Sequence, residues 1–211
     1  MTHAHIRRVQ QDALRLAAAV GVRDDLQLKA LEAAALLHDV GKLAVPEHIL
    51  NKPGRLTSAE YEKMKTHAPV GAEILAEVDF PYPVVPIVRH HHESWDGTGY
   101  PDGLRGTDIP IGARILSIVD CFDALTSDRP YRRALTTAQV RTILLERRGT
   151  MYDPLVVDAF LELVAGDEGH TPAASPSPLA ASKPFLAEAR TQEETIEAVC
   201  TAGSAERNWP R

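Results

Sequence analysis

The chain has 211 residues, of which 44% are hydrophobic and 25% charged, and its formal net charge is −6. This length provides one domain with a substantial core plus a tail, and leaves little room for a second full domain. The negative charge argues against a long nucleic acid as partner, because such binding usually needs a basic face. No apolar run approaches the roughly 18 residues that span a bilayer, and the N-terminus has neither a signal nor a transit pattern. We therefore expect a cytoplasmic protein with no membrane partner.

The two cysteines, Cys121 and Cys200, are far apart and belong to no Cys-x-x-Cys pair. Neither a disulfide framework nor a thiolate zinc site is therefore expected. Cys121 is interpreted as a core residue.

Apolar residues recur at helical spacing, without a period-two strand or a fixed-length repeat, so we predict an all-α domain. Helices are expected over residues 4–20, 26–39, 84–93, 111–125 and 154–164. The second of these is apolar nearly all round from Ala33 to Leu37, as expected of a central buried helix. Gly41 would end it.

Capping residues place two further helices. Thr57 and Glu60 match a capping box that opens a helix carrying His67. Thr136 and Gln139 match a second one. Pro69 suits the first turn of another helix, which would begin just after His67.

Glycine and proline mark the connections. Pro53-Gly54 predicts a turn, and the glycines between Asp96 and Pro110 predict a long loop of the kind that is often functional. From about Gly166 the composition turns to Pro, Ala and Ser. We therefore expect a helical bundle over residues 1–165 and a disordered tail over 166–211. A short amphipathic helix over 185–199 is the alternative for part of that tail.

Histidines and aspartates recur along the chain at intervals typical of one helical hairpin. Side chains so far apart in sequence converge only if neighbouring helices point them into one bundle interior, where bundle metal sites are built. Imidazole and carboxylate together suit iron, manganese or zinc. The residues concerned are His5, His38, Asp39, His67, His91, His92 and Asp120.

Taken singly, each of these residues has an ordinary structural interpretation. Asp39 follows a long apolar run, so its charge either emerges into solvent or is compensated by a metal. Lys42 is otherwise a cation that favours a helix C-terminus. His91 and His92, if helical, point about 100° apart, which suits two metals, a metal and a substrate, or a surface pair. Asp120 interrupts an apolar helix and therefore needs a partner.

The joint pattern is similar to the HD-GYP family, a branch of the HD metal-dependent phosphohydrolases. The resemblance runs from about His5 through Phe160 and covers several motifs in family order. They are His5-x-x-Arg8-Val9, His38-Asp39-Val40-Gly41-Lys42, Ile49-Leu50-Asn51-Lys52-Pro53-Gly54, His67, His91-His92-Glu93-x-x-Asp96-Gly97-x-Gly99-Tyr100-Pro101, Asp120-Cys121-Phe122-Asp123-Ala124-Leu125-Thr126 and Arg129-Pro130-Tyr131-Arg132.

The resemblance implies an HD-type bundle whose interior holds two divalent metals, iron or manganese, with zinc, nickel and magnesium as alternatives. The implied ligands are His5, His38, Asp39, His67, His91, His92 and Asp120. Asp39 would bridge the metals, and a water between them would attack phosphorus in line. Lys42 would hold a phosphate oxygen or assist the leaving alkoxide. Arg129 and Arg132 would grip the phosphates of the ligand.

The loop with Gly99-Tyr100-Pro101 is linked by the resemblance to ligand recognition and to contacts with diguanylate cyclase domains. Tyr100 either stacks on a guanine or packs the loop, since the same residues are also ordinary turn formers. Met1 stands where some family members have a glutamate for a third metal, which favours two metals. No sensory domain precedes the helices, so we expect a stand-alone effector or a fragment.

The function that the resemblance implies is hydrolysis of cyclic di-GMP to pGpG, and onward to GMP, in bacterial second-messenger signalling. Two alternatives stay open. One is a binding module that senses cyclic di-GMP or docks a partner without turnover. The other is a phosphohydrolase of another nucleotide, such as cyclic GMP-AMP.

Overall fold

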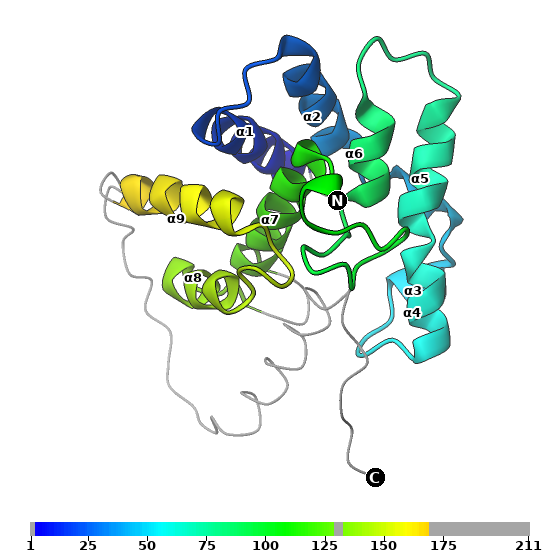
Figure 1. Cartoon of the computed structure of the whole chain (residues 1–211). Helices are drawn as coiled ribbons and strands as arrows, with labels where there is room; N and C mark the ends of the chain where they lie inside the picture. The colour runs from blue at the N-terminus through cyan, green and yellow to red at the C-terminus, as the bar shows by residue number, and fades with distance from the viewer. Residues whose placement is uncertain (1–2, 129–132, 169–211) are drawn as a thin grey trace, which may run out of the picture.

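The computed structural model describes residues 3–128 and 133–168, and these residues form an all-helical bundle (Figure 1). The predicted fold class is thus confirmed. The elements are α1 His3–Ala19, α2 Asp25–Leu37, η1 Val40–Ala44, α3 Glu47–Leu50, α4 Ser58–Lys65, α5 His67–Ala76, α6 Val84–His90, η2 Gly106–Asp108, α7 Ile111–Thr126, α8 Thr137–Glu146 and α9 Pro154–Glu168. Here η marks a 3₁₀ helix. No helix of the described part is long and apolar enough to cross a membrane.

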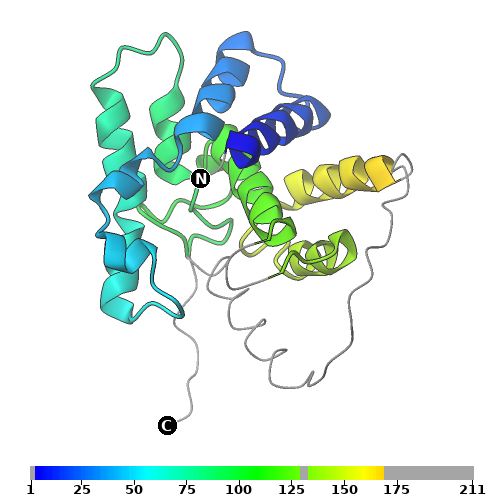
Figure 2. The same ribbon diagram turned by 180° about the vertical axis from the view of Figure 1, so that it is seen from behind.

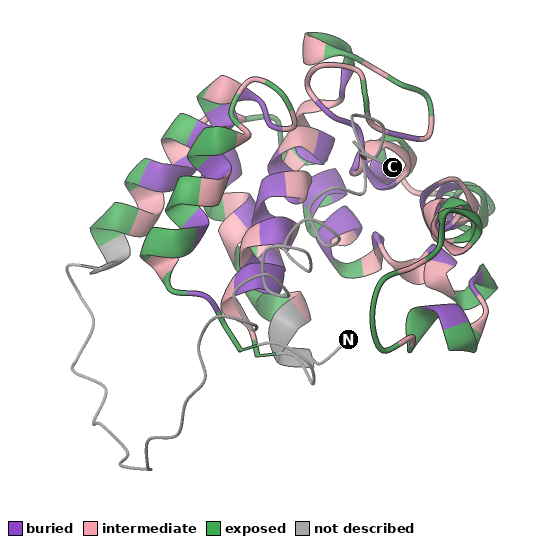
Figure 3. Ribbon diagram, turned by 90° about the horizontal axis from the view of Figure 1, so that it is seen from below, coloured by how far each residue is buried: buried purple, intermediate pink, exposed green. Residues whose placement is uncertain are grey.

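Helix α7 is the centre of the bundle and packs against α1, α2, α6, α8 and α9. Ile115, Leu116 and Ile118 on this helix are all fully buried, and Figure 3 shows buried positions gathered toward the middle of the bundle. Cys121 is 6% exposed, as expected of a core residue. The prediction that α2 is the central helix is wrong, because α2 buries one face and leaves Leu36 42% exposed.

Both predicted capping boxes are present. The Thr57 hydroxyl accepts from the Glu60 N–H, the Thr136 hydroxyl accepts from the Gln139 N–H, and each third residue bonds back to its cap. These caps satisfy main-chain N–H groups that a helix start leaves unpaired. His67, however, does not belong to the helix opened by Thr57, because α4 ends at Lys65 and α5 begins at His67.

Gly41 does not end α2 as a helix cap. That helix ends at Leu37, and Gly41 is a buried residue of η1. A Cβ at Gly41 would lie 1.9 Å from the main-chain oxygen of His67 and 2.5 Å from the nitrogen of Gly71. Gly41 is therefore needed for the close approach of η1 to α5. That approach brings the residues after α2 next to His67.

The loop predicted between Asp96 and Pro110 is present and contains only the short η2. Helix α6 is shorter than predicted, since it ends at His90 and not at Glu93. His91 is therefore the C-cap residue that follows α6, and His92 lies in the same turn. Helix α9 continues to Glu168, past the predicted domain boundary at residue 165. The rest of the predicted tail, including the alternative helix over 185–199, lies outside the described residues.

Candidate metal centre

Three buried histidines come together from the ends of three elements. His38 follows α2, His67 opens α5 and His91 follows α6, and each is at most 2% exposed. In each ring Nδ1 bonds to the main-chain oxygen three residues earlier, at 3.1 Å to Ala35, 2.7 Å to Met64 and 2.6 Å to Val88. A carbonyl oxygen only accepts, so Nδ1 carries the proton. Each ring thus directs Nε2 into a shared interior, the arrangement found for metal-ligating histidines.

The Nε2 atoms of this cluster lack ordinary partners. Those of His38 and His91 are buried and accept no hydrogen bond in the described part of the chain. Nε2 of His67 lies 3.1 Å from Nε2 of His92, and the ligand atoms of His67, His91 and His92 all lie within 4.8 Å of one another. Buried polar atoms without partners are rare, and coordination of an ion is one recognised explanation.

Two carboxylates face the same interior. Nε2 of His38 lies 3.7 Å from an oxygen of Asp39 and 3.7 Å from an oxygen of Asp120, and Nε2 of His67 lies 3.8 Å from Asp39. These distances are too long for hydrogen bonds. They are close to the separation of about 3.4 Å expected between two ligand atoms that share a tetrahedral ion. The donor set and its spacing therefore fit a divalent metal.

The electrostatics of the cluster favour the forms that bind metals, which are neutral imidazole and ionised carboxylate. Burial lowers the pKa of His91 to about 3, and it also lowers the pKa values of His67 and His92. Burial opposes ionisation of Asp39, but the neighbouring His38 and Lys42 hold the pKa of that carboxyl below its usual value. The same two neighbours lower the pKa of Asp120.

His38 differs from the other histidines of the cluster. Burial opposes its charged form, but the carboxylates of Asp39 and Asp120 raise the pKa of His38 to about 9. Without a metal, a proton on Nε2 therefore neutralises part of the carboxylate charge. A cation bound between these groups would replace that proton.

Asp39 and Lys42 form the accessible edge of the cluster. The Asp39 side chain is 11% exposed, so the interpretation of a carboxylate emerging freely into solvent is wrong. Lys42 donates from Nζ to the Asp39 carboxylate at 2.6 Å, and its own side chain is 41% exposed. Lys42 thus places a positive charge beside the cluster where a ligand can reach it.

Tyr100 covers the cluster from the loop after α6. It is 8% exposed, and its ring stacks on that of His92 at 5.0 Å between centroids with an angle of 23°. Nζ of Lys65 lies 5.8 Å from the Tyr100 centroid. Tyr100 therefore packs the loop against the histidines in this structure. Its stacking on a guanine stays a prediction.

The loop is held by Glu93, a residue to which the sequence reasoning gave no role. Glu93 is 4% exposed, and its carboxylate accepts from the N–H groups of Asp102 at 2.8 Å and Leu104 at 3.1 Å. A Cβ at Gly99 would lie 2.2 Å from the nitrogen of Ser94, so only glycine fits there. The signal for Glu93 was its place directly after the paired histidines.

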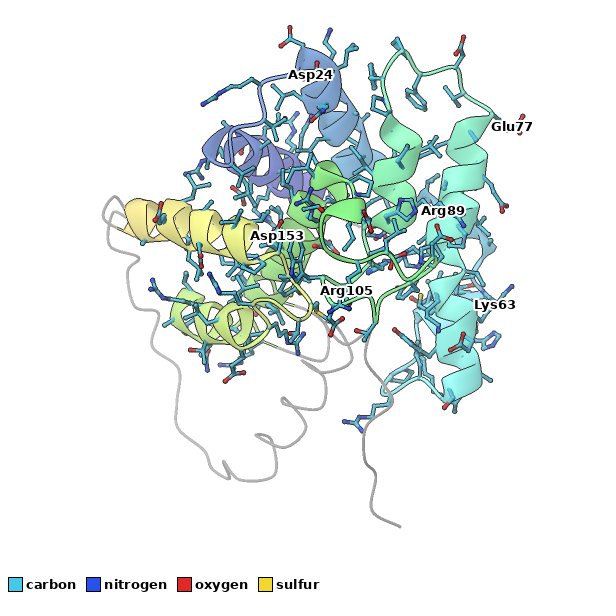
Figure 4. All side chains as sticks on the ribbon, in the orientation of Figure 1. Asp24, Lys63, Glu77, Arg89, Arg105 and Asp153 are labelled. Carbon is cyan, nitrogen blue, oxygen red and sulfur yellow. The ribbon has the colours of Figure 1, made fainter. Side chains whose placement is uncertain are left out.

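Arginines fasten the outer side of this loop, where Figure 4 labels Arg89, Arg105 and Asp153. Arg89 makes two hydrogen bonds to Asp102, at 2.7 and 2.8 Å. Arg114 on α7 donates from Nε to the main-chain oxygen of Ile109 in the loop at 2.9 Å, and it also bonds to Asp153, just before α9, at 2.7 Å. The loop is therefore tied to the helices on both sides of the cluster.

Three predicted site residues are not placed by the structure. His5 lies in the first turn of α1, whose start is next to α7 (Figure 2), but its side chain is outside the described part. Arg129 and Arg132 also lie outside the described residues. Arg8, one turn after His5, ties α1 to α7 through hydrogen bonds to Asp123 and Ser127.

Comparison with known proteins identifies the fold family. The HD domain family matches residues 2–156. The cyclic di-GMP phosphodiesterase response regulator RpfG of Xanthomonas campestris pv. campestris is 42% identical over 162 residues, covering 76% of this chain and 43% of the relative. The 3′3′-cGAMP-specific phosphodiesterase 2 of Vibrio cholerae is 40% identical over 163 residues, covering 76% and 31%.

A solved structure has the same fold. An HDG"Y"P protein from Bdellovibrio bacteriovorus superimposes with a TM-score of 0.62 at 24% identity, covering 77% of this chain and 52% of that one. The chain belongs to the HD domain family, and the predicted resemblance to its HD-GYP branch is confirmed. Its histidine cluster is the metal site of an HD domain. The chain spans less than half the length of the curated relatives it matches.

Proposed function

We propose that the chain is a metal-dependent phosphodiesterase that hydrolyses a cyclic dinucleotide, with cyclic di-GMP as substrate and pGpG, then GMP, as products. The observation that carries this proposal is the pair of buried, unpartnered Nε2 atoms of His38 and His91, with carboxylate oxygens of Asp39 and Asp120 each 3.7 Å from that of His38. The names of the relatives, which are phosphodiesterases of cyclic dinucleotides, support the reaction class.

We assign the metal ligands to His5, His38, Asp39, His67, His91, His92 and Asp120. Asp39 lies within 4 Å of two histidine Nε2 atoms, which makes it the candidate for a carboxylate shared by two metals. Two divalent ions, iron or manganese, would supply Lewis-acid charge for the phosphoryl oxygens and an acidified water as nucleophile. The mixed imidazole and carboxylate donors suit these metals, and zinc as well.

The side chains of the protein contribute binding and orientation. Burial favours the neutral forms of His67, His91 and His92. The Nδ1 hydrogen bonds of His38, His67 and His91 keep those rings in position. The ammonium group of Lys42 lies at the edge of the cluster, where we propose that it binds a phosphate oxygen or assists the leaving alkoxide. Arg129, Arg132 and Tyr100 are proposed to contact the substrate. The Gly99-Tyr100-Pro101 segment is proposed as the contact for diguanylate cyclase domains.

A second substrate, 3′3′-cGAMP, is a specific alternative. One relative at 40% identity is named for cyclic di-GMP and another, also at 40%, for 3′3′-cGAMP. Both ligands contain two phosphodiesters and at least one guanine. The same metal chemistry serves either, so the side chains around the metals decide between them.

The test is anaerobic purification, metal analysis and identification of the products formed from each dinucleotide. We expect Asp39→Ala to lower kcat by about 100-fold or more. Mutation of residues that only hydrogen-bond to a metal ligand already lowers metal affinity or activity by about 10–100-fold. Asp79→Ala, at an exposed position between α5 and α6, is the matched control and should leave kcat unchanged. Cleavage that survives Asp39→Ala contradicts the assignment of Asp39. Binding of cyclic di-GMP by metal-loaded protein without cleavage would instead show a sensor.

A further inference from the structure

An apolar groove lies next to the metal cluster, and the proposed chemistry does not use it. Its apolar lining includes Leu36 of α2, Val40 and Leu43 of η1, and Leu50 of α3. Figure 2 shows the segment that leads from α2 to α3 on the side of the molecule facing the viewer. The volume of about 560 Å³ is within the usual range of small-molecule sites, which is roughly 300–1,000 Å³.

The groove leaves large apolar side chains open to solvent. Leu43 is 84% exposed, Leu36 42% and Leu50 39%. Single exposed leucines are ordinary, whereas three that line one groove offer a ligand a continuous apolar contact. This exposure also explains why α2 is apolar nearly all round without being central.

The groove is continuous with the metal cluster, because Asp39 and Lys42 line it as well. Lys42, at the edge of the metal cluster, and Leu43 line the same groove. A ligand phosphate held at Lys42 and the metals therefore has its attached nucleoside within reach of Leu43. The groove is therefore suited to a ligand that carries both a phosphate and a flat apolar ring.

Glu47, the first residue of α3, adds a polar feature to this lining. One of its carboxylate oxygens accepts a long hydrogen bond from Asn51 at 3.4 Å, and the other accepts none within the described part of the chain. Guanine has two adjacent donors, N1–H and N2–H₂, on one edge, and a carboxylate accepts from both. Adenine has a donor and an acceptor on the corresponding edge, and the acceptor repels a carboxylate.

We propose that this base groove binds one purine of the dinucleotide and that Glu47 makes the groove selective for guanine. The proposal rests on the proposed function, since it adds a base subsite to the phosphodiesterase centre. Leu36, Leu43 and Leu50 supply the apolar contact with the ring. Glu47 supplies the hydrogen-bond acceptors.

The apolar part of the proposal is tested with Leu43→Ala. Because Leu43 is so exposed, the variant folds normally, and we expect a severalfold higher KM for cyclic di-GMP with kcat unchanged. Leu155→Ala is the matched control, since Leu155 on α9 is 75% exposed and lies outside the groove. Equal KM values for the two variants and the wild type would overturn the apolar contact.

The selectivity is tested with Glu47→Gln on cyclic di-GMP, 3′3′-cGAMP and cyclic di-AMP. We expect KM for cyclic di-GMP to rise about tenfold, because the variant loses the paired hydrogen bonds from guanine to the carboxylate. KM for cyclic di-AMP should stay the same or fall. Glu77→Gln, at an exposed position at the end of α5, is the control. An equal rise for all three substrates would overturn guanine selection.

Hydrolysis of bis(p-nitrophenyl) phosphate separates failure of the base groove from failure of the proposed function. If the wild type cleaves the dinucleotides and neither variant changes KM, the base groove is wrong and the phosphodiesterase stands. If the wild type cleaves only the nitrophenyl ester, the substrate class is wrong and the base groove falls with it. Loss of a dimer in Leu43→Ala, measured by sedimentation, would assign the groove to a second copy and overturn the proposal.

Discussion

His38, His67 and His91 each donate Nδ1–H to a main-chain carbonyl, and this pairing determines which nitrogen faces the interior. The three carbonyls belong to Ala35 of α2, Met64 of α4 and Val88 of α6, and each lies in the last turn of its helix. The rings are therefore oriented before any cation binds, which lowers the cost of assembling a metal site. His38 is distinguished from the others by the two carboxylates that face its Nε2.

This difference predicts proton release on metal binding. Asp39 and Asp120 raise the pKa of His38 to about 9 against the effect of burial, so the ring of the metal-free protein is protonated at pH 7. A metal needs the unprotonated nitrogen. We expect binding at pH 7 to release about one proton, and metal affinity to rise with pH and level off above about 9. Calorimetry in two buffers of different ionisation enthalpy measures the released proton.

The matched measurement is the same titration at pH 10, where His38 is already neutral and no proton should be released from it. An affinity that is constant between pH 6 and pH 9 would contradict the assignment of His38 as a ligand.

At the scale of elements, the site depends on two close contacts between helices. One is the approach of η1 to α5 at Gly41 and Gly71, which sets Asp39 beside His67. The other is the contact of α1 with α7, where Arg8 bonds to the buried Asp123. Each contact joins segments that are far apart in sequence and that supply different proposed ligands.

Gly41→Ala should disturb the first contact. The new Cβ would meet main-chain atoms of α5, which cannot move aside as a flexible side chain could. We expect a loss of at least about 2 kcal/mol in the free energy of unfolding, together with weaker metal binding, measured by urea denaturation and metal titration. Gly166→Ala on α9 is the control, because a Cβ there meets nothing within 4 Å, and it should stabilise by up to about 1 kcal/mol.

Arg8→Ala should loosen the second contact. The Arg8 side chain is 48% exposed while that of Asp123 is 4% exposed, so solvent screens part of the attraction. We expect a loss of about 1–2 kcal/mol in the free energy of unfolding. Arg15→Ala on the same helix removes an ion pair to Asp12 that lies within α1, and should cost at most about 0.5 kcal/mol. Equal losses in the two variants would show that Arg8 does not join the helices.

At the scale of the whole molecule, the metal cluster links helices that α7 alone does not hold together. His67 belongs to α5, which packs against α6, η1 and α4 but makes no comparable contact with α7 in the described part. Proposed ligands from α2, α5, α6 and α7 face one interior, and α1 is expected to add His5. A metal at this point would therefore join the α5 side of the molecule to the central helix.

Metal removal should accordingly lower stability. A ligand present at about 100 times its Kd stabilises the folded state by about 2.7 kcal/mol, which corresponds to about 5–10 °C in Tm for a domain of this size. We expect chelation to lower Tm by that amount and added metal to restore it, as measured by calorimetry. Asp39→Ala should show a much smaller shift on chelation. A Tm that does not respond to chelation would contradict a metal that bridges these helices.

The sequence by itself determined the features that depend on neighbouring residues. The capping boxes at Thr57 and Thr136 and the long loop after Asp96 could be predicted because each involves contacts within a few residues. The order of histidines and aspartates identified the family, and with it the residues that we propose as metal ligands. These features need no knowledge of how the helices pack.

Tertiary structure alone decided the rest. Whether α2 or α7 is central depends on which helices surround each, and the local apolar pattern is similar in both. Gly41 could be predicted only as a helix end, since its role is set by His67 and Gly71, residues distant in sequence. The groove beside Leu43 arises where α2, η1 and α3 leave apolar side chains uncovered. The central position of α7 and the role of Gly41 follow from packing between distant segments, and the groove follows from the angles between consecutive elements. Spacing along the chain encodes neither.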